Sequence, residues 1–79
     1  MKFRVYVSFK NGILDPEAEA IKKTITGLGF NNIKTLSRGK FFDIEMNSSN
    51  VSNKEIIKNI SNEILSNPII ENFQIKKID

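Results

Sequence analysis

The first ten residues strongly constrain the fold, because their apolar and polar side chains alternate without a break. In an extended backbone one side carries the apolar residues Phe3, Val5, Val7 and Phe9, and the other carries Arg4, Tyr6, Ser8 and Lys10. A period of two is typical of a β-strand with one buried face. The sequence therefore predicts a sheet that needs a covering layer on one side.

A helix is predicted over residues 16–28. Asp15 is a good N-cap, and Pro16 fits the first helical position, where its missing N–H removes no hydrogen bond. Gly29 suits the left-handed position that ends a helix, with Phe30 folding back onto Ile25. The apolar residues recur every three or four positions, which predicts one buried stripe made of Ala18, Ile21, Ile25 and Leu28.

A second amphipathic helix is predicted over residues 52–66. Ser52 and Glu55 have the spacing of a capping box, and Val51 and Ile56 have that of a hydrophobic staple. The Asn67-Pro68 pair ends the helix, because proline cannot continue it. Two roles are open for this pair: it only ends the helix, which is the favoured interpretation, or it also shapes a loop that docks on a partner.

The remaining segments read as strands. Residues 32–47 are interrupted at Arg38-Gly39, and two arrangements are open: a tight hairpin at Gly39, or one long bent strand with a bulge there. Residues 69–78 form the last strand. The predicted fold is α+β: a ferredoxin-like two-layer sandwich in the order β-α-β-(β)-α-β, with an antiparallel sheet and two helices on one face.

The composition excludes several classes of enzyme. The 79 residues contain no Cys and no His, which removes thiol nucleophiles, the commonest general base and the commonest metal ligands. No apolar run reaches the roughly 18 residues of a membrane span. We therefore expect a single domain over residues 1–79 without catalytic, cofactor-binding or metal-binding residues, placed in the cytoplasm and away from membranes.

Two binding functions fit a small ferredoxin-like domain. Arg38-Gly39-Lys40-Phe41-Phe42 faintly resembles the motif with which RNA-recognition modules stack bases, and Tyr6 could join Phe41 on the sheet. Asn11-Gly12 could serve as the first turn of an ACT-like regulatory module. The net charge is +3, but ten of the twelve cations are Lys, which bind phosphate less specifically than Arg. We do not expect nucleic acid as the partner.

Residues 10–16, Lys-Asn-Gly-Ile-Leu-Asp-Pro, resemble the Lys-x-Gly-Val-Leu-Asp-Pro signature of the PurS family, the small subunit of phosphoribosylformylglycinamidine (FGAM) synthase. Three further marks follow in order: Leu28-Gly29-Phe30, Gly39-Lys40, and residues 67–73, Asn-Pro-Ile-Ile-Glu-Asn-Phe. One position departs from the family pattern. The family carries Arg two residues before its Gly-Lys, whereas here Ser37 stands there and Arg38 follows it, which along a strand would place the Arg on the other face.

The resemblance implies a PurS-like fold and a non-catalytic subunit of the FGAM synthase complex in de novo purine biosynthesis. That ligase makes FGAM from formylglycinamide ribonucleotide (FGAR), ATP and glutamine-derived ammonia. It implies bridging between the glutaminase subunit, PurQ, and the large synthase subunit, PurL, which would carry the ATP and Mg²⁺. It also implies a homodimer or tetramer. The motif residues that we expect at interfaces are Lys10, Gly12, Leu14, Asp15, Pro16, Gly39, Lys40, Asn67, Pro68 and Glu71.

Overall fold

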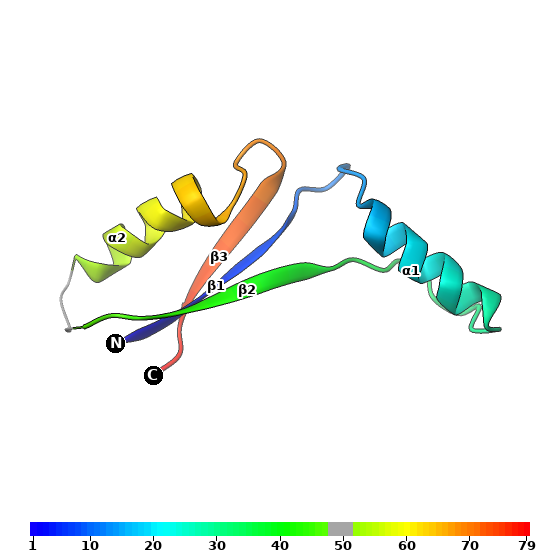
Figure 1. Cartoon of the computed structure of the whole chain (residues 1–79), viewed down its shortest axis with the longest axis horizontal. Coiled ribbons are helices and arrows are strands. Elements are labelled where there is room, and N and C mark those ends of the chain that lie inside the picture. The colour runs from blue at the N-terminus through cyan, green and yellow to red at the C-terminus, as the bar shows by residue number, and fades with distance from the viewer. Residues whose placement is uncertain (48–51) are drawn as a thin grey trace.

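The computed structural model describes residues 1–47 and 52–79. Its elements, in chain order, are β1 (Lys2–Phe9), α1 (Pro16–Gly27), β2 (Gly39–Glu45), α2 (Asn53–Ile60), the π-helical turn η1 (Ser61–Leu65) and β3 (Glu71–Lys77). Figure 1 shows a narrow sheet with α2 on one side and α1 beyond one end. Within the described residues, no helix has the length and apolar character needed to cross a membrane.

The sheet has the order β2-β1-β3, and both outer strands run antiparallel to β1. Val5 at its centre faces Phe42 on one side and Ile75 on the other. The predicted α+β class is confirmed, in the order β-α-β-α-β. The middle segment forms one strand that begins at Gly39, and the residues from 30 to 38 lie outside the sheet. The predicted first half of that strand was wrong, since Ile33 and Leu36 do not alternate with a period of two.

The core lies between the sheet and α2. Its fully buried side chains are Phe3, Val5 and Val7 from β1 and Ile57 from α2, as the alternation of β1 predicted. Apolar residues of the outer strands complete this face, but Phe42, Ile44, Phe73 and Ile75 are only partly buried. The helix therefore covers the central strand well and leaves part of the face open.

The position of α1 corrects the expected sandwich. The prediction placed both helices on one face of the sheet, whereas α1 lies past the end of the sheet and extends the molecule to 51 × 27 × 14 Å (Figure 1). Ala18 is the only buried residue of α1, and Ile21 is 45% exposed. The predicted buried stripe of α1 is thus largely open to solvent within one chain.

Both ends of α1 form as their sequences predict. The Asp15 carboxylate accepts hydrogen bonds from the backbone N–H groups of Glu17, at 3.1 Å, and Ala18, at 3.2 Å. At the other end Gly29 has a φ of 100°, and the N–H of Phe30 donates to the Ile25 carbonyl over 3.3 Å. These are the bonds of a Schellman stop.

The start of α2 is confirmed to within one residue, because the helix begins at Asn53. Ser52 has helical backbone angles, and its side chain does not form the capping bond that the capping box predicted. Val51, the other half of the expected staple, lies outside the described residues. The end of this helix widens into η1, where the N–H of Ser66 donates to the Ser61 carbonyl over 3.0 Å.

Candidate interaction surface

The ten motif residues gather at one end of the sheet. They lie in a first motif loop (residues 10–16), at the start of β2 (Gly39 and Lys40), and in a second motif loop (residues 67–71). The two loops are joined directly, since the N–H of Lys10 donates to the Ile70 carbonyl over 2.9 Å. Lys40 and Glu71 line one small hollow beside β1, so all three segments contribute to one surface.

The first motif loop begins with a tight turn. The N–H of Ile13 donates to the Lys10 carbonyl over 3.2 Å, and Gly12 between them has a φ of 85°. Asn11 has a negative φ, so this is a type II turn, in which the third position favours glycine. The turn leaves Leu14 largely exposed just before the helix.

The second motif loop is held by its own hydrogen bonds. The N–H of Asn67 donates to Glu71 Oε1 over 2.6 Å, and the N–H of Glu71 donates to the Asn67 carbonyl over 2.7 Å. Asn67 Oδ1 also accepts from the N–H of Ile69, at 3.1 Å. Asn67 and Glu71 therefore shape the loop, and they leave Pro68 and the 80% exposed Ile69 at its surface.

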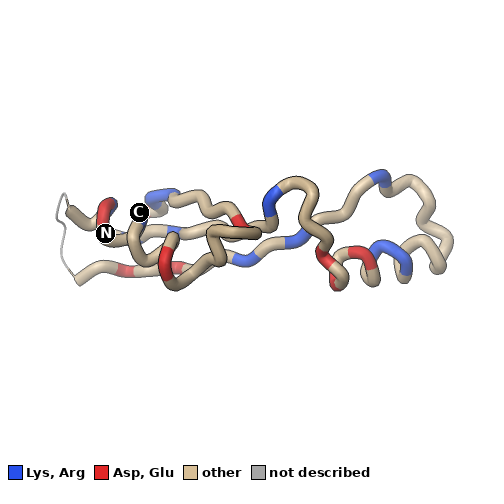
Figure 2. Tube along the Cα trace, turned by 90° about the horizontal axis from the view of Figure 1, so that it is seen from above, with Lys and Arg blue, Asp and Glu red and all other residues tan. Residues whose placement is uncertain are grey.

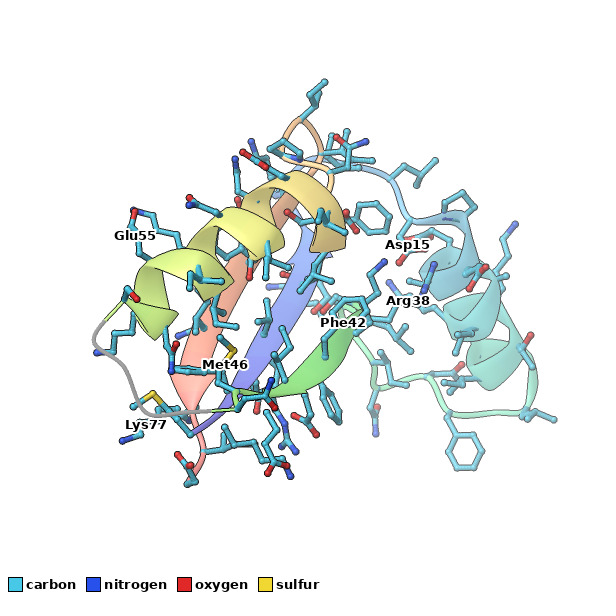
Figure 3. All side chains as sticks on the ribbon, turned by 60° about the vertical axis from the view of Figure 1, so that its left-hand side comes forward. Asp15, Arg38, Phe42, Met46, Glu55 and Lys77 are labelled. Atoms are coloured by element: carbon cyan, nitrogen blue, oxygen red, sulfur yellow. The ribbon has the colours of Figure 1, made fainter. Side chains whose placement is uncertain are left out.

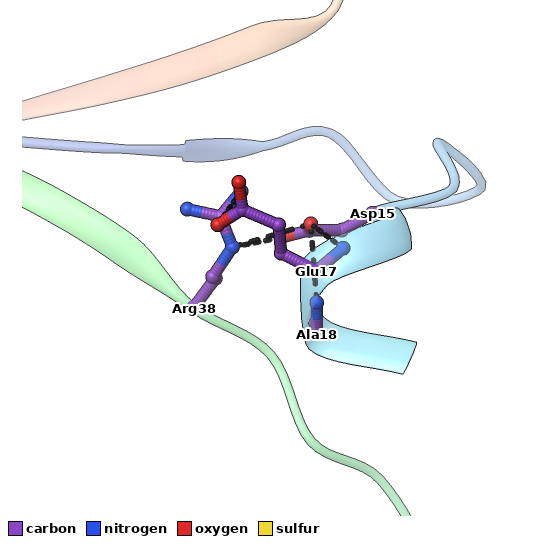
Figure 4. Close-up of polar contacts among 4 residues, drawn as sticks. All are labelled: Asp15, Glu17, Ala18 and Arg38. Atoms are coloured by element: carbon purple, nitrogen blue, oxygen red, sulfur yellow. Dashed lines mark hydrogen bonds and ion pairs between the residues drawn. The ribbon is translucent and has the colours of Figure 1, made fainter. Parts of the chain in front are cut away.

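An ion cluster joins the start of α1 to the residue that precedes β2 (Figure 4). Nε of Arg38 donates to Asp15 Oδ1 over 3.2 Å and lies 3.0 Å from Oδ2 as an ion-pair contact. Nη2 of Arg38 lies 3.2 Å from Glu17 Oε2. Because Asp15 also caps α1, one carboxylate links the helix start to the residue before β2.

A hollow of about 390 Å³ lies between this ion cluster and the first motif loop. Its wall mixes backbone and side chains of the turn with residues of α1 and of the segment before β2. Figure 3 shows Arg38 and Asp15 facing each other across the gap between the sheet and α1. Arg38 and Asp15 pair with each other, and the other two charged residues of the wall, Lys10 and Glu19, have opposite signs, so the hollow is not lined by charge of a single sign.

The sequence left open which residues Arg38 contacts, and the structure shows that it pairs with Asp15 and Glu17. Arg38 precedes β2 instead of lying within it, so the alternation of a strand does not decide where its side chain points. The signal in the sequence was the pair of acids, Asp15 and Glu17, at the start of α1. Lys40 lies on the inner side of β2, with its Nζ 5.7 Å from the centre of the Phe42 ring.

The outer face of the sheet carries a second cluster, which sequence reasoning found only in part. Arg4 Nε donates to Asp43 Oδ1 over 2.7 Å, and Cζ of the same guanidinium lies over the Phe41 ring, 4.3 Å from its centre. Tyr6 lies beside Phe41, with 6.0 Å between the ring centres. The hydrogen bond from Arg4 holds the pKa of Asp43 below its usual range.

The aromatic pair expected of a base-stacking platform is thus present, but the charge around it does not favour phosphate. Asp43 neutralises Arg4, the only cation in contact with these rings within the described residues. Figure 2 shows acidic and basic residues interspersed along the molecule, without a continuous basic stripe. In the part of the chain that the structure describes, no group of three or more acidic side chains could hold a metal ion.

The sequence profile of one family, described as "PurS: Phosphoribosylformylglycinamidine (FGAM) synthase", matches residues 2–79. A curated relative, the phosphoribosylformylglycinamidine synthase subunit PurS of Methanocaldococcus jannaschii, is 36% identical over 76 residues. The alignment covers 95% of this chain and 92% of the relative.

Solved structures agree with the sequence match. The PurS structure from Bacillus subtilis superposes with a TM-score of 0.86 at 25% identity, covering 95% of this chain and 94% of the other. A chain in the structure of PurLQS from Thermotoga maritima superposes with a TM-score of 0.84 at 27% identity, covering 98% and 95%. The extended shape with α1 beyond the sheet therefore has close counterparts among solved chains.

Proposed function

This chain belongs to the PurS family, the small subunit of FGAM synthase in purine biosynthesis, and we propose that it bridges the glutaminase and synthase subunits without catalysing a step itself. The observation that carries this proposal is the match of a PurLQS chain over almost the full length of this one. The absence of Cys and His from the sequence agrees with it, because glutaminase chemistry needs an activated nucleophile.

In this proposal the chain is a single cytoplasmic domain over residues 1–79, and the complex divides the chemistry among its subunits. PurL binds ATP, Mg²⁺ and FGAR, and PurQ releases ammonia from glutamine. This chain holds neither cofactor nor metal. The purified chain alone is expected to turn over neither glutamine nor ATP.

The second motif loop is the best-formed docking element on the surface. Its backbone is fixed by Asn67 and Glu71, so little conformational entropy is lost when Pro68 and Ile69 enter an interface. Ile69 is 80% exposed at the tip of this loop, so its burial in an interface would remove apolar area from water. We assign this loop to the contact with a larger subunit.

Ile69→Asp should remove this chain from the complex. A buried carboxylate without a partner would weaken the contact by about tenfold or more, and co-elution with PurL and PurQ measures the loss. Pro68→Ala should weaken assembly less, through a looser loop. Ile64→Asp is the matched control, since Ile64 is also an exposed isoleucine but lies on η1.

This experiment distinguishes two hypotheses: that the second motif loop lies in the interface, and that the chain bridges the two larger subunits. Full co-elution of a folded Ile69→Asp chain would remove the second motif loop from the interface. Failure of the wild-type chain to co-elute with both larger subunits would overturn the bridging role itself.

We also propose that the chain works as a homo-oligomer, at least a dimer. The inner sheet face is only partly covered by α2, and most of the apolar side of α1 is left open by its own chain. A second copy would supply both missing partners if α1 of each copy packed on the open part of the other's sheet. The expected layer of two helices on one face would then be completed between chains.

Ile21→Glu should shift this oligomer toward the monomer. Ile21 lies on the apolar side of α1, and a glutamate there would be desolvated in the contact, weakening self-association by about tenfold or more. Thr26→Glu adds the same charge to the exposed surface of α1 and should leave association unchanged. Light scattering is the measurement, and a wild-type mass of 9.0 kDa at micromolar concentration would contradict the proposal.

A further inference from the structure

Residues 16–36 form an arm: α1 and the segment that returns along it toward β2. The arm is internally tied, since Lys22 Nζ donates to the Lys34 carbonyl over 2.8 Å. Its connections to the sheet are the first motif loop and the short segment at residues 37 and 38. Ala18 is the only buried residue of α1, and so small a side chain supplies little apolar area to hold the arm in place.

The Arg38 cluster is the charged contact that crosses from the arm to the base of β2 among the described residues. The guanidinium uses two different groups on two carboxylates, Nε on Asp15 and Nη2 on Glu17. Two contacts along a rigid planar group fix direction as well as distance, which a single ammonium does not do. Asp15 is the N-cap of α1 and Glu17 lies in its first turn, so contacts to both carboxylates depend on the direction of the helix axis.

We propose that Arg38 is a positioning residue that holds the arm at the angle at which a second copy can pair with it. This inference rests on the proposed self-association. The physical basis is preorganisation: an arm held at one angle has less freedom to lose when it packs on another chain. Gly12, with its φ of 85°, lies in the turn on one side of the arm, and no buried apolar side chain braces that turn.

The ionic nature of this contact has a consequence for assembly. Arg38 is partly exposed, with Asp15 mostly covered and Glu17 open to solvent. Charges in such a position are screened at high salt, where the Debye length falls to about 3 Å at 1 M. High salt should therefore loosen the arm in the wild-type chain and have no further effect once Arg38 is removed.

The test measures the arm angle and self-association separately. The chain has no Cys, so Thr26→Cys on α1 and Lys76→Cys on β3 give two clean labelling sites. Single-molecule fluorescence energy transfer at picomolar concentration reports the arm in isolated chains. Light scattering and dilution series on unlabelled protein report association.

With Arg38 in place we expect one narrow transfer distribution, and with Arg38→Ala a broad one. Association should weaken by up to about fivefold, the effect of losing a partly exposed ion pair. Arg38→Lys should restore only part of both effects. Lys58→Ala, which removes an equal charge from the exposed surface of α2, away from the arm, should change neither. At a concentration low enough for the chain to be monomeric, the denaturation midpoint should stay constant in all variants, because the core lies under α2 and does not include the arm.

A narrow energy-transfer distribution in Arg38→Ala, unchanged from the wild type, would overturn the proposal. This result would count against it even if the wild-type chain proved monomeric. A broadened distribution with undiminished association would show that the arm angle does not govern pairing, and would also reject the inference. A monomeric wild-type chain whose arm loosens in Arg38→Ala would confirm the positioning and reject the proposed oligomer alone.

Discussion

Ile57→Ala should lower the stability of the chain strongly and bring its denaturation midpoint well below that of the wild type. Ile57 is 0% exposed and is the one fully buried apolar residue that α2 contributes, packed against Phe3, Val5 and Val7 of β1. Truncating such a side chain costs about 2–5 kcal/mol. A chain of this length has roughly 4–12 kcal/mol in total, so one substitution removes a large share.

Chemical denaturation followed by circular dichroism measures this loss. The matched control is Ile64→Ala, the same substitution at a residue that is 74% exposed on η1, which should change the free energy of unfolding by less than about 0.5 kcal/mol. All chains must be compared at one concentration, because self-association adds to apparent stability. Equal midpoints for the two variants would mean that α2 does not cover the core as the structure has it.

The core could be predicted from the sequence because β1 depends on a short-range rule. Successive side chains of a strand point to opposite faces whatever else the chain does, so Phe3, Val5 and Val7 had to share one side. The turn chemistry was equally local. Gly29 ends α1 in the left-handed conformation that its sequence predicts, and Asp15 caps the same helix.

The position of α1 could not be predicted, since an amphipathic pattern shows only that a face needs cover. The stripe of α1 is present as expected, but Ile21 and Leu28 are exposed, at 45% and 72%. The choice between the chain's own sheet and the sheet of a second copy depends on the lengths and directions of two loops. The prediction considered one chain alone, and it therefore placed both helices on the same sheet.

The candidate surface was predictable as a set of segments, but its contacts were not. The motif residues of three separate segments meet at one end of the sheet because β1, β2 and β3 are antiparallel and start or end there. Asn67 and Glu71 turned out to hold their own loop. The ion pairs of Arg38 depend on how the chain bends between residues 30 and 38. That segment has no regular pattern of apolar residues from which its path could be predicted.

Gly39→Ala should destabilise the chain, although glycine-to-alanine changes in strands are often favourable. Gly39 pairs with Ser8 at the end of the β1–β2 ladder, and a Cβ built on it would lie 2.6 Å from the Val7 carbonyl oxygen. That oxygen belongs to the backbone of the central strand, so it cannot move without shifting the sheet. Relief of such an overlap costs about 1–3 kcal/mol, more than the roughly 0.4–1 kcal/mol gained by restricting the unfolded chain.

Gly27→Ala provides the opposite result from the same chemical change. Gly27 is the last residue of α1, and a Cβ there would meet nothing within 4 Å. Alanine has the higher helix propensity, so this variant should be as stable as the wild type or more so, by up to about 1 kcal/mol. Urea midpoints of the two variants should therefore lie on opposite sides of the wild type. If Gly39→Ala were as stable as Gly27→Ala, the close approach of β2 to Val7 would be wrong, and with it the register that brings Lys40 and the second motif loop to one surface.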